Sequence, residues 1–254
     1  MAADLERLAR EFEGEQFKNL RASLSAQANI ARQLGAPEHF GNSQRASTPK
    51  TPEAGVFKLD TPDAVTDSFG RIWEQRGQLV VITNFEITQC TYSQNELKEL
   101  EKRNLRVGYL PGEVATQQTR HILGEMFPKM RSHSVQEGNS VTNDENPSGW
   151  FDYEAAIDAP YLDTKEKELM DRIKKHGRTL LSLNQYIVAG QDSKLFTGQY
   201  LDETTTWSRL GSRRGGRVVP ARFDRGGSFS VGWELFADNR YPLLGGRSSG
   251  VNKA

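Results

Sequence analysis

The chain has 254 residues, a formal net charge of zero and a hydrophobic fraction of 36%. This length suits one large domain or two small ones, and the low hydrophobic fraction indicates linkers or exposed loops. The single cysteine, Cys90, excludes an internal disulfide framework and a cysteine-based zinc site. No apolar run reaches the ~18 residues of a membrane helix, and the charged N-terminus has no apolar signal core. We therefore expect a cytoplasmic protein without membrane contact.

Charge is distributed unevenly along the chain. Residues 209–254 contain eight arginines and one lysine against three acidic residues, a balance of +6. Because the whole chain is neutral, residues 1–208 carry the compensating −6. The composition predicts a basic C-terminal segment attached to an acidic body.

The N-terminal part has the pattern of a helix followed by a linker. Apolar residues recur at three- and four-residue spacing over 3–34, and Gly35 and Pro37 end that pattern. Residues 41–55 are small, polar and proline-containing, as in a linker. The helix either packs on its own chain or recruits a protein partner through residues 3–34. The sequence thus predicts three regions: a helical arm (1–40), a linker (41–55) and an α+β domain (56–254).

The first part of that domain predicts a small α/β unit. A cap followed by proline begins a helix over 61–77, and a β-branched run predicts a buried strand over 78–87. A capping-box pattern opens a helix over 93–102, and a second strand follows at 105–110. Strand, helix and strand indicate an α/β unit within 56–127, although the short connection leaves antiparallel pairing open.

The next segments alternate between helix and loop. A helix begins at Pro111 and ends before a long polar loop over 128–149, a length typical of functional or disordered loops. A strand is predicted over 150–157 and a helix capped by Thr164 follows it. Residues 179–190 are apolar, and their period fits either a strand or a buried helix.

The last segment predicts a β-hairpin. The runs GRVVPARF and SFSVGWELF flank a four-residue turn, Asp224 to Gly227. One side of the hairpin is apolar and is expected to pack on the core. The predicted fold class is therefore α+β, with a helical arm, a small α/β unit (56–127) and an antiparallel β-rich C-terminal module (150–254).

The stretch from Trp207 to Trp233 is the best candidate for a binding surface. It contains six arginines, and glycines precede the hairpin in what we expect to be a flexible basic loop. Arginine offers planar donors that suit phosphates, and aromatic neighbours can stack on bases. Two alternatives stay open: the arginines dock onto the acidic body, or they bind a small anion. The candidate ligand-binding residues are Trp207, Arg209, Arg213, Arg214, Arg217, Arg222 and Arg225.

The catalytic candidates are few. Asp152 and Glu154 lie two apart on a predicted strand and so share a side, where carboxylates could hold a metal ion or transfer protons. His133 in the long loop could add an acid or base. The pattern is also common on solvated strands. The chain has no phosphate-binding loop and no dinucleotide fingerprint, so no cofactor and no resident metal are expected.

Three segments resemble a type of bacterial protein of unassigned function. They are SGWFDYEAAIDAP, TTTWSRLGSRRGGRVVPARF and GGRSS, within roughly the last 105 residues. The resemblance implies a bacterial, cytoplasmic protein and implies no reaction, cofactor or site.

The sequence thus supports three hypotheses about function. The first is a non-catalytic module that binds a polyanion, most plausibly nucleic acid, through the arginine-rich hairpin region. The second is an assembly protein that acts through residues 3–34. The third is a metal-dependent phosphodiesterase that uses Asp152, Glu154 and His133.

The assembly hypothesis predicts that deleting residues 1–40 changes the oligomeric mass, because the apolar stripe of the arm would be the contact between partners. Light scattering of the full chain and of the deleted chain would measure the change. A monomer of unchanged state in both proteins would contradict the hypothesis.

Overall fold

The structure is a computed structural model that describes residues 59–80, 84–130, 132–143, 145, 147–232 and 237–250. All of these residues belong to one unit, Thr51–Ala254. The predicted helical arm (1–40) and linker (41–55) lie outside the described residues. Within those residues no helix has both the length and the apolar character to cross a membrane.

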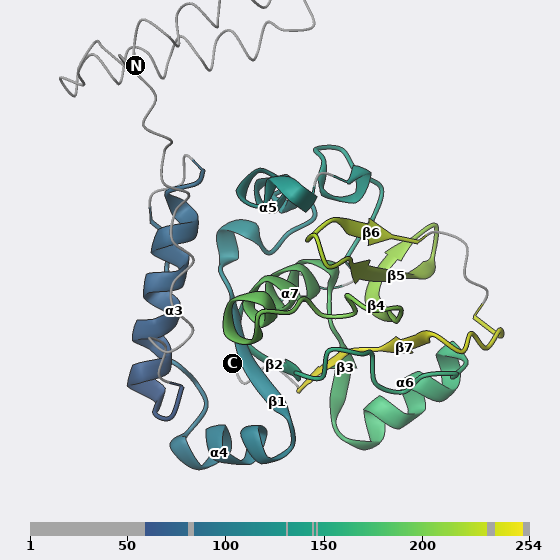
Figure 1. Cartoon of the computed structure of the whole chain (residues 1–254), viewed down its shortest axis with the longest axis horizontal. Coiled ribbons are helices and arrows are strands. Elements are labelled where there is room, and N and C mark those ends of the chain that lie inside the picture. The colour runs from purple at the N-terminus through teal and green to yellow at the C-terminus, as the bar shows by residue number, and fades with distance from the viewer. Residues whose placement is uncertain are drawn as a thin grey trace, which may run out of the picture. The chain divides into compact units, whose positions relative to one another are not determined.

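The predicted α+β class with a β-rich C-terminal part is confirmed (Figure 1). The α-helices are α3 (Pro62–Gly77), α4 (Gln94–Lys102), α5 (Arg120–Met126), α6 (Glu166–Lys175) and α7 (Leu183–Thr197). Short 3-10 helices are η2 (Gly112–Val114), η3 (Pro128–Met130) and η4 (His133–Val135). The strands are β1 (Leu105–Leu110), β2 (Gly149–Glu154), β3 (Arg178–Leu180), β4 (Trp207–Arg214), β5 (Arg217–Phe223), β6 (Phe229–Val231), β7 (Leu244–Gly246) and β8 (Ser248–Gly250).

Local capping signals predict two of the helices correctly. Thr61 caps α3, where its hydroxyl accepts a hydrogen bond from the Ala64 N–H at 3.3 Å. Ser93 and Glu96 form the predicted capping box at the start of α4. Thr164 is not the cap of α6: Lys165 is, and the Thr164 hydroxyl instead donates to the Tyr161 carbonyl at 2.8 Å.

The segment after Pro111 is less regular than predicted. The expected helix is divided into η2 and α5, separated by turns. The segment over 128–149 is mainly irregular, as predicted, but it contains η3 and η4. It also buries Met130, Val135 and Val141 in the core. This segment is therefore part of the packed body.

The strand predicted over 78–87 is wrong for the described part of that range. Side chains satisfy the Glu86 backbone: Glu113 accepts from its N–H at 3.2 Å, and the Tyr109 hydroxyl donates to its carbonyl at 2.9 Å. Its neighbour Phe85 packs edge-on against Trp73, 5.0 Å between ring centroids. The described part of this segment forms no ladder, and β1 pairs with β2, antiparallel from Leu105–Glu154 to Leu110–Gly149.

The strands form three sheets around one central helix. β1 pairs with β2, β3 pairs with β8, and the largest sheet has the order β6-β5-β4-β7, with β7 parallel to β4. Helix α7 packs against β1 on one side and β4 on the other (Figure 1). Its residues Leu183 to Gly190 are all buried, so the sequence shows no amphipathic period there. A capping box of Ser182 and Gln185 separates α7 from β3.

One hydrophobic core joins the two predicted halves of the domain. Phe69 of α3 packs edge-on against Trp150 of β2, with ring centroids 5.3 Å apart. Tyr186 of α7 stacks on Phe223 of β5 at 5.8 Å. All four residues belong to the same cluster of buried side chains, so the segments 56–127 and 150–254 share one core.

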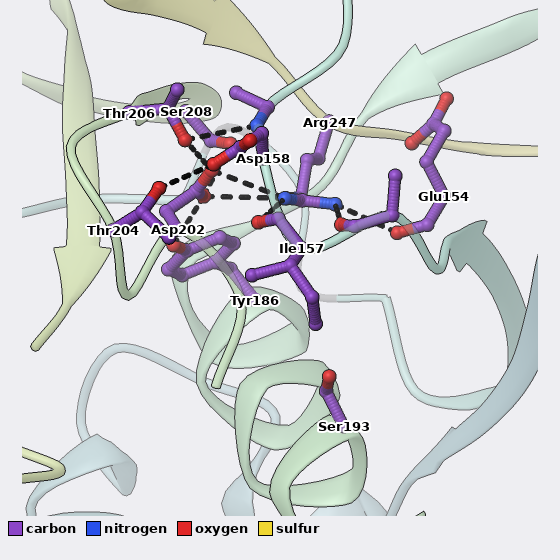
Figure 2. A network of polar contacts seen from close by, with 12 residues as sticks. Glu154, Ile157, Asp158, Tyr186, Ser193, Asp202, Thr204, Thr206, Ser208 and Arg247 are labelled. Carbon is purple, nitrogen blue, oxygen red and sulfur yellow. Dashed lines mark hydrogen bonds and ion pairs between the residues drawn. The ribbon is translucent and has the colours of Figure 1, made fainter. Parts of the chain in front are cut away.

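A buried ion pair between Arg247 and Asp202 lies where the sheets meet (Figure 2). Both side chains are fully buried. Arg247 uses all five of its N–H donors: two bind the Asp202 carboxylate at 3.1 and 3.2 Å, and three bind main-chain carbonyls at 2.7–2.8 Å. Those carbonyls belong to Glu154, Ala156 and Ile157. Burial acts to lower the pKa of Arg247, but Asp202, with smaller contributions from Tyr186 and Glu154, raises it above its ordinary value.

Asp202 in turn accepts hydrogen bonds from three hydroxyl groups, on α7, on β4 and on the segment just before β4 (Figure 2). Tyr186 of α7 donates at 2.6 Å, Thr206 at 2.8 Å and Ser208 of β4 at 2.7 Å. The pair thus connects α7, β4 and the end of β2 to the turn between β7 and β8. Strand β7, just before Arg247, packs closely on the segment that follows β2. Glycine permits this contact, because a Cβ at Gly245 would collide with the Pro160 carbonyl oxygen.

Replacing Arg247 by Met is expected to lower the free energy of unfolding by about 3–5 kcal/mol, because Asp202 would keep a buried charge without its cation. Urea unfolding followed by circular dichroism measures the loss. The matched control is Arg240→Met. It removes a 2.6 Å ion pair with Glu168 whose side chains are 47% and 38% exposed, and should cost less than about 1 kcal/mol. Equal losses in the two variants would contradict a central role for Arg247.

Tyr186 makes stability sensitive to alkaline pH. Burial and the Asp202 carboxylate raise its pKa well above the ordinary value of 10.0. Since the folded pKa is the higher one, the phenol stabilises the fold fully below pH 10. That contribution is lost above pH 10, at about 1.4 kcal/mol per pH unit.

Tyr186→Phe is expected to be less stable than the parent by about 1 kcal/mol at pH 7, but to lose stability less steeply between pH 10 and about pH 11. Urea unfolding at both pH values compares the slopes. The same slope in both proteins would show that Tyr186 does not titrate with unfolding.

Candidate ligand-binding site

The basic loop predicted before the hairpin is a strand. Residues 207–214 form β4, which pairs antiparallel with β5 and has Arg214 opposite Arg217. The two-residue turn between them is Gly215-Gly216, with φ of 56° and 79°. Two positive φ values are typical of a type I′ hairpin turn, which glycine adopts without strain. The arginines near this tip are therefore held by a hairpin rather than by a flexible loop.

The predicted hairpin of β5 and β6 is present, and its two faces differ as expected. Val219, Ala221 and Phe223 of β5 belong to the core together with Phe229 and Val231 of β6. On the other face the Arg222 guanidinium lies over the Trp207 ring, 5.4 Å from its centroid. Both residues are half-buried. Trp233 lies outside the described residues.

The candidate arginines fall into two groups. Arg209 is fully buried and donates to the carbonyls of Thr164 at 2.6 Å and Asn239 at 3.2 Å. Burial lowers its pKa. Arg209 therefore stabilises the fold and is not one of the arginines that a ligand could contact at the surface. The others keep surface exposure: Arg217 and Arg225 are exposed, and Arg213, Arg214 and Arg222 are half-buried.

Some arginines of the basic segment pair with acidic residues of the preceding part of the chain, as one of the alternatives predicted. Arg247 pairs with Asp202 inside the fold, and Arg240 pairs with Glu168. Arg213 lies 3.8 Å from Glu166, with side chains 31% and 20% exposed. A long, partly exposed pair of this kind stabilises little and competes weakly with a ligand.

The carboxylates Asp152 and Glu154 do share a side of β2, and both are engaged there. Asp152 pairs with Arg178 at 2.5 Å and accepts from the Tyr92 hydroxyl at 3.2 Å. Glu154 accepts from the Ser248 N–H at 2.7 Å and from the Ser248 hydroxyl. Both carboxylates therefore anchor β8 and β3, and no observation brings a substrate to them.

His133 lies elsewhere, at the start of η4, and is exposed. The described ranges contain no group of three or more His, Cys, Asp or Glu side chains that could hold a metal ion.

A pocket of about 390 Å³ lies beside the hairpin, at the N-terminus of α7. Its wall is mixed: hydroxyl and amide groups alternate with apolar side chains, and it contains one arginine and one glutamate. Of the ligand-binding residues predicted from the sequence, Arg213 lines this pocket. The lining residues are Asn143, Glu145, Pro147, Met170, Thr179, Leu180, Ser182, Gln185, Gly211, Ser212, Arg213 and Ser249.

Another buried arginine, Arg120, lies behind this pocket, where it binds the lining residue Asn143. It donates to Asn143 at 2.9 Å, Asn184 at 2.6 Å and Asn139 at 2.8 Å, and all its partners among the described residues are neutral oxygens. Burial lowers its pKa to about 10, so it remains charged at neutral pH. The Asn143 oxygen also accepts from the Ser212 hydroxyl. A positive charge therefore lies behind the pocket wall that Asn143 and Ser212 form.

Several of these residues could not be recognised from the sequence. Arg120 belongs to a helix whose other residues are unremarkable, and Asn143 lies in the polar loop. Nothing in the sequence around Arg178 and Arg247 distinguishes these two buried arginines from arginines at the surface. The one signal in the sequence is the polar loop over 128–149, whose length is typical of either a functional or a disordered loop. It contributes Asn143, Glu145 and Pro147 to the pocket.

Comparisons with known protein families, with curated proteins and with solved structures find no match to this chain. Its function is therefore argued from the site itself.

Proposed function

We propose that this protein is a non-catalytic binding protein whose ligand is a polyanion, most plausibly single-stranded nucleic acid, bound along the β4–β5 hairpin. The observation that carries the proposal is the distribution of arginine along β5. Arg213, Arg214 and Arg217 lie near one end of that strand, and Arg222 and Arg225 lie at or just beyond the other. Seven residues of strand span roughly 20 Å, which is long enough to follow several phosphates.

Trp207 and Arg222 also offer a stacking contact for a base at one end of the hairpin. Trp207 lies half-buried beneath Arg222, and aromatic rings and guanidinium planes both stack on bases without regard to sequence. Arginine binds phosphate oxygens with paired, planar donors. Basic groups at both ends of the strand and a stacking pair at one of these ends are the two kinds of contact that bind a single strand.

The other two hypotheses have less support. Assembly through residues 3–34 concerns residues outside those described, and it stays a prediction. A phosphodiesterase would need Asp152 and Glu154, whose oxygens already bind Arg178, Tyr92 and Ser248. Neither hypothesis accounts for the arginines at the two ends of the hairpin.

The double variant Arg213→Ala, Arg217→Ala is expected to weaken binding of a mixed-sequence single-stranded oligonucleotide of about 12 nucleotides. Affinity of the parent should fall steeply with salt, because bound phosphates release counterions. Each lost phosphate contact should reduce the slope of log K against log salt by about 0.7. Fluorescence anisotropy across a salt series measures both quantities.

The control is Arg240→Ala, which removes one positive charge of the same segment away from the hairpin. It should leave the salt slope close to that of the parent. The proposal would be abandoned if the parent bound no oligonucleotide at low salt, or if the double variant bound as well as the parent.

A further inference from the structure

We infer that the pocket beside the hairpin holds one nucleotide unit of the bound strand. The inference rests on the proposed function, because Arg213 both lines the pocket and belongs to the basic hairpin. A single residue thus connects the elongated surface to the pocket. The pocket volume of about 390 Å³ lies within the range of small-ligand sites.

The lining has the mixture of groups that a nucleoside requires. Met170, Leu180 and Pro147 are apolar and suit the face of a base or the carbon side of a sugar. Thr179 and Ser249 contribute hydroxyls, which can donate to and accept from a ribose or the edge of a base. A site for a bare inorganic anion would not need the apolar part.

The pocket wall at the start of α7 is rigid. Ser182 and Gln185 hold one another in a capping box, through hydrogen bonds of 3.0 and 3.2 Å. Ser212 accepts from the Leu183 N–H at 2.7 Å and donates to Asn143. The capping box uses Oε1 of Gln185, so its Nε2 donors are the part of that side chain that a ligand can use. Groups fixed in this way lose little conformational entropy when a ligand binds.

The charges around the pocket also distinguish a nucleotide from a simple anion. Arg213 in the wall and Arg120 behind Asn143 favour a phosphate. Glu145 in the same wall repels a second anion but accepts hydrogen bonds from the N–H groups of a base. A ligand with one anionic end and one hydrogen-bonding ring could interact favourably with the arginines and with Glu145.

The test compares AMP, GMP, CMP, UMP and inorganic phosphate by isothermal titration calorimetry with the full chain. At least one mononucleotide is expected to bind at least ten times more tightly than phosphate. Thr179 is exposed at the middle of β3, between two buried neighbours, so Thr179→Phe should fill the pocket without disturbing the core. It should weaken mononucleotide binding at least tenfold, whereas the matched control Thr179→Ser should change it less than threefold.

A second variant, Met170→Trp, fills the pocket from α6 and covers the case in which Thr179→Phe does not fold, as judged by circular dichroism. Unchanged mononucleotide affinity in a folded filling variant would overturn the inference, as would binding of phosphate alone. Oligonucleotide binding distinguishes the two proposals. If the oligonucleotide binds and no mononucleotide does, the pocket inference fails and the proposed function stands. If mononucleotides bind and the oligonucleotide does not, the proposed function fails.

Discussion

The buried pair of Arg247 and Asp202 is the interaction on which the arrangement of the other elements depends. Either charge alone would strongly destabilise the interior, since removing an ion from water is costly unless its hydrogen bonds are replaced. Here every arginine donor and both carboxylate oxygens have partners. Those partners come from β2, α7, β4 and the loop that follows β2, so the pair is satisfied only when all of them are in place. The pair therefore acts mainly by favouring this one arrangement of the elements, rather than by its net contribution to the free energy of folding.

The same junction determines the shape of the candidate site. Arg247 lies between β7 and β8, and its carbonyl accepts from the Leu181 N–H at 3.0 Å, just before α7 begins. β8 is held further by Arg178, which binds Ser248 at 2.8 Å and Asp152 at 2.5 Å. Strand β3 and the start of α7 are therefore positioned by a strand more than 60 residues later in the chain. The pocket lies between these elements and the hairpin, so its dimensions follow from a long-range contact.

The parts of the fold that could be predicted are those with local causes. The caps at Thr61 and Ser93 and the turn from Asp224 to Gly227 act within a few residues, and the helices and the β5–β6 hairpin that they define are where the sequence indicates. The partner of β1 could not be predicted. The segment before it has the composition of a strand, but Tyr109 and Glu113 bind its backbone, and β2 pairs with β1 instead. Pairing between distant segments depends on tertiary packing, which composition does not report.

The role of each arginine also depends on tertiary structure. A basic segment of the sequence is therefore not the same as a basic surface of the protein. Eight arginines follow residue 208, yet Arg209 and Arg247 are fully buried. Arginine suits such positions because its planar fork can bind several carbonyls at once and stays charged when buried. A charge balance therefore overestimates the surface available to a polyanion. What supports a binding surface is the smaller group that remains on the hairpin, in which Trp207 and Arg222 stack and Arg213 reaches the pocket.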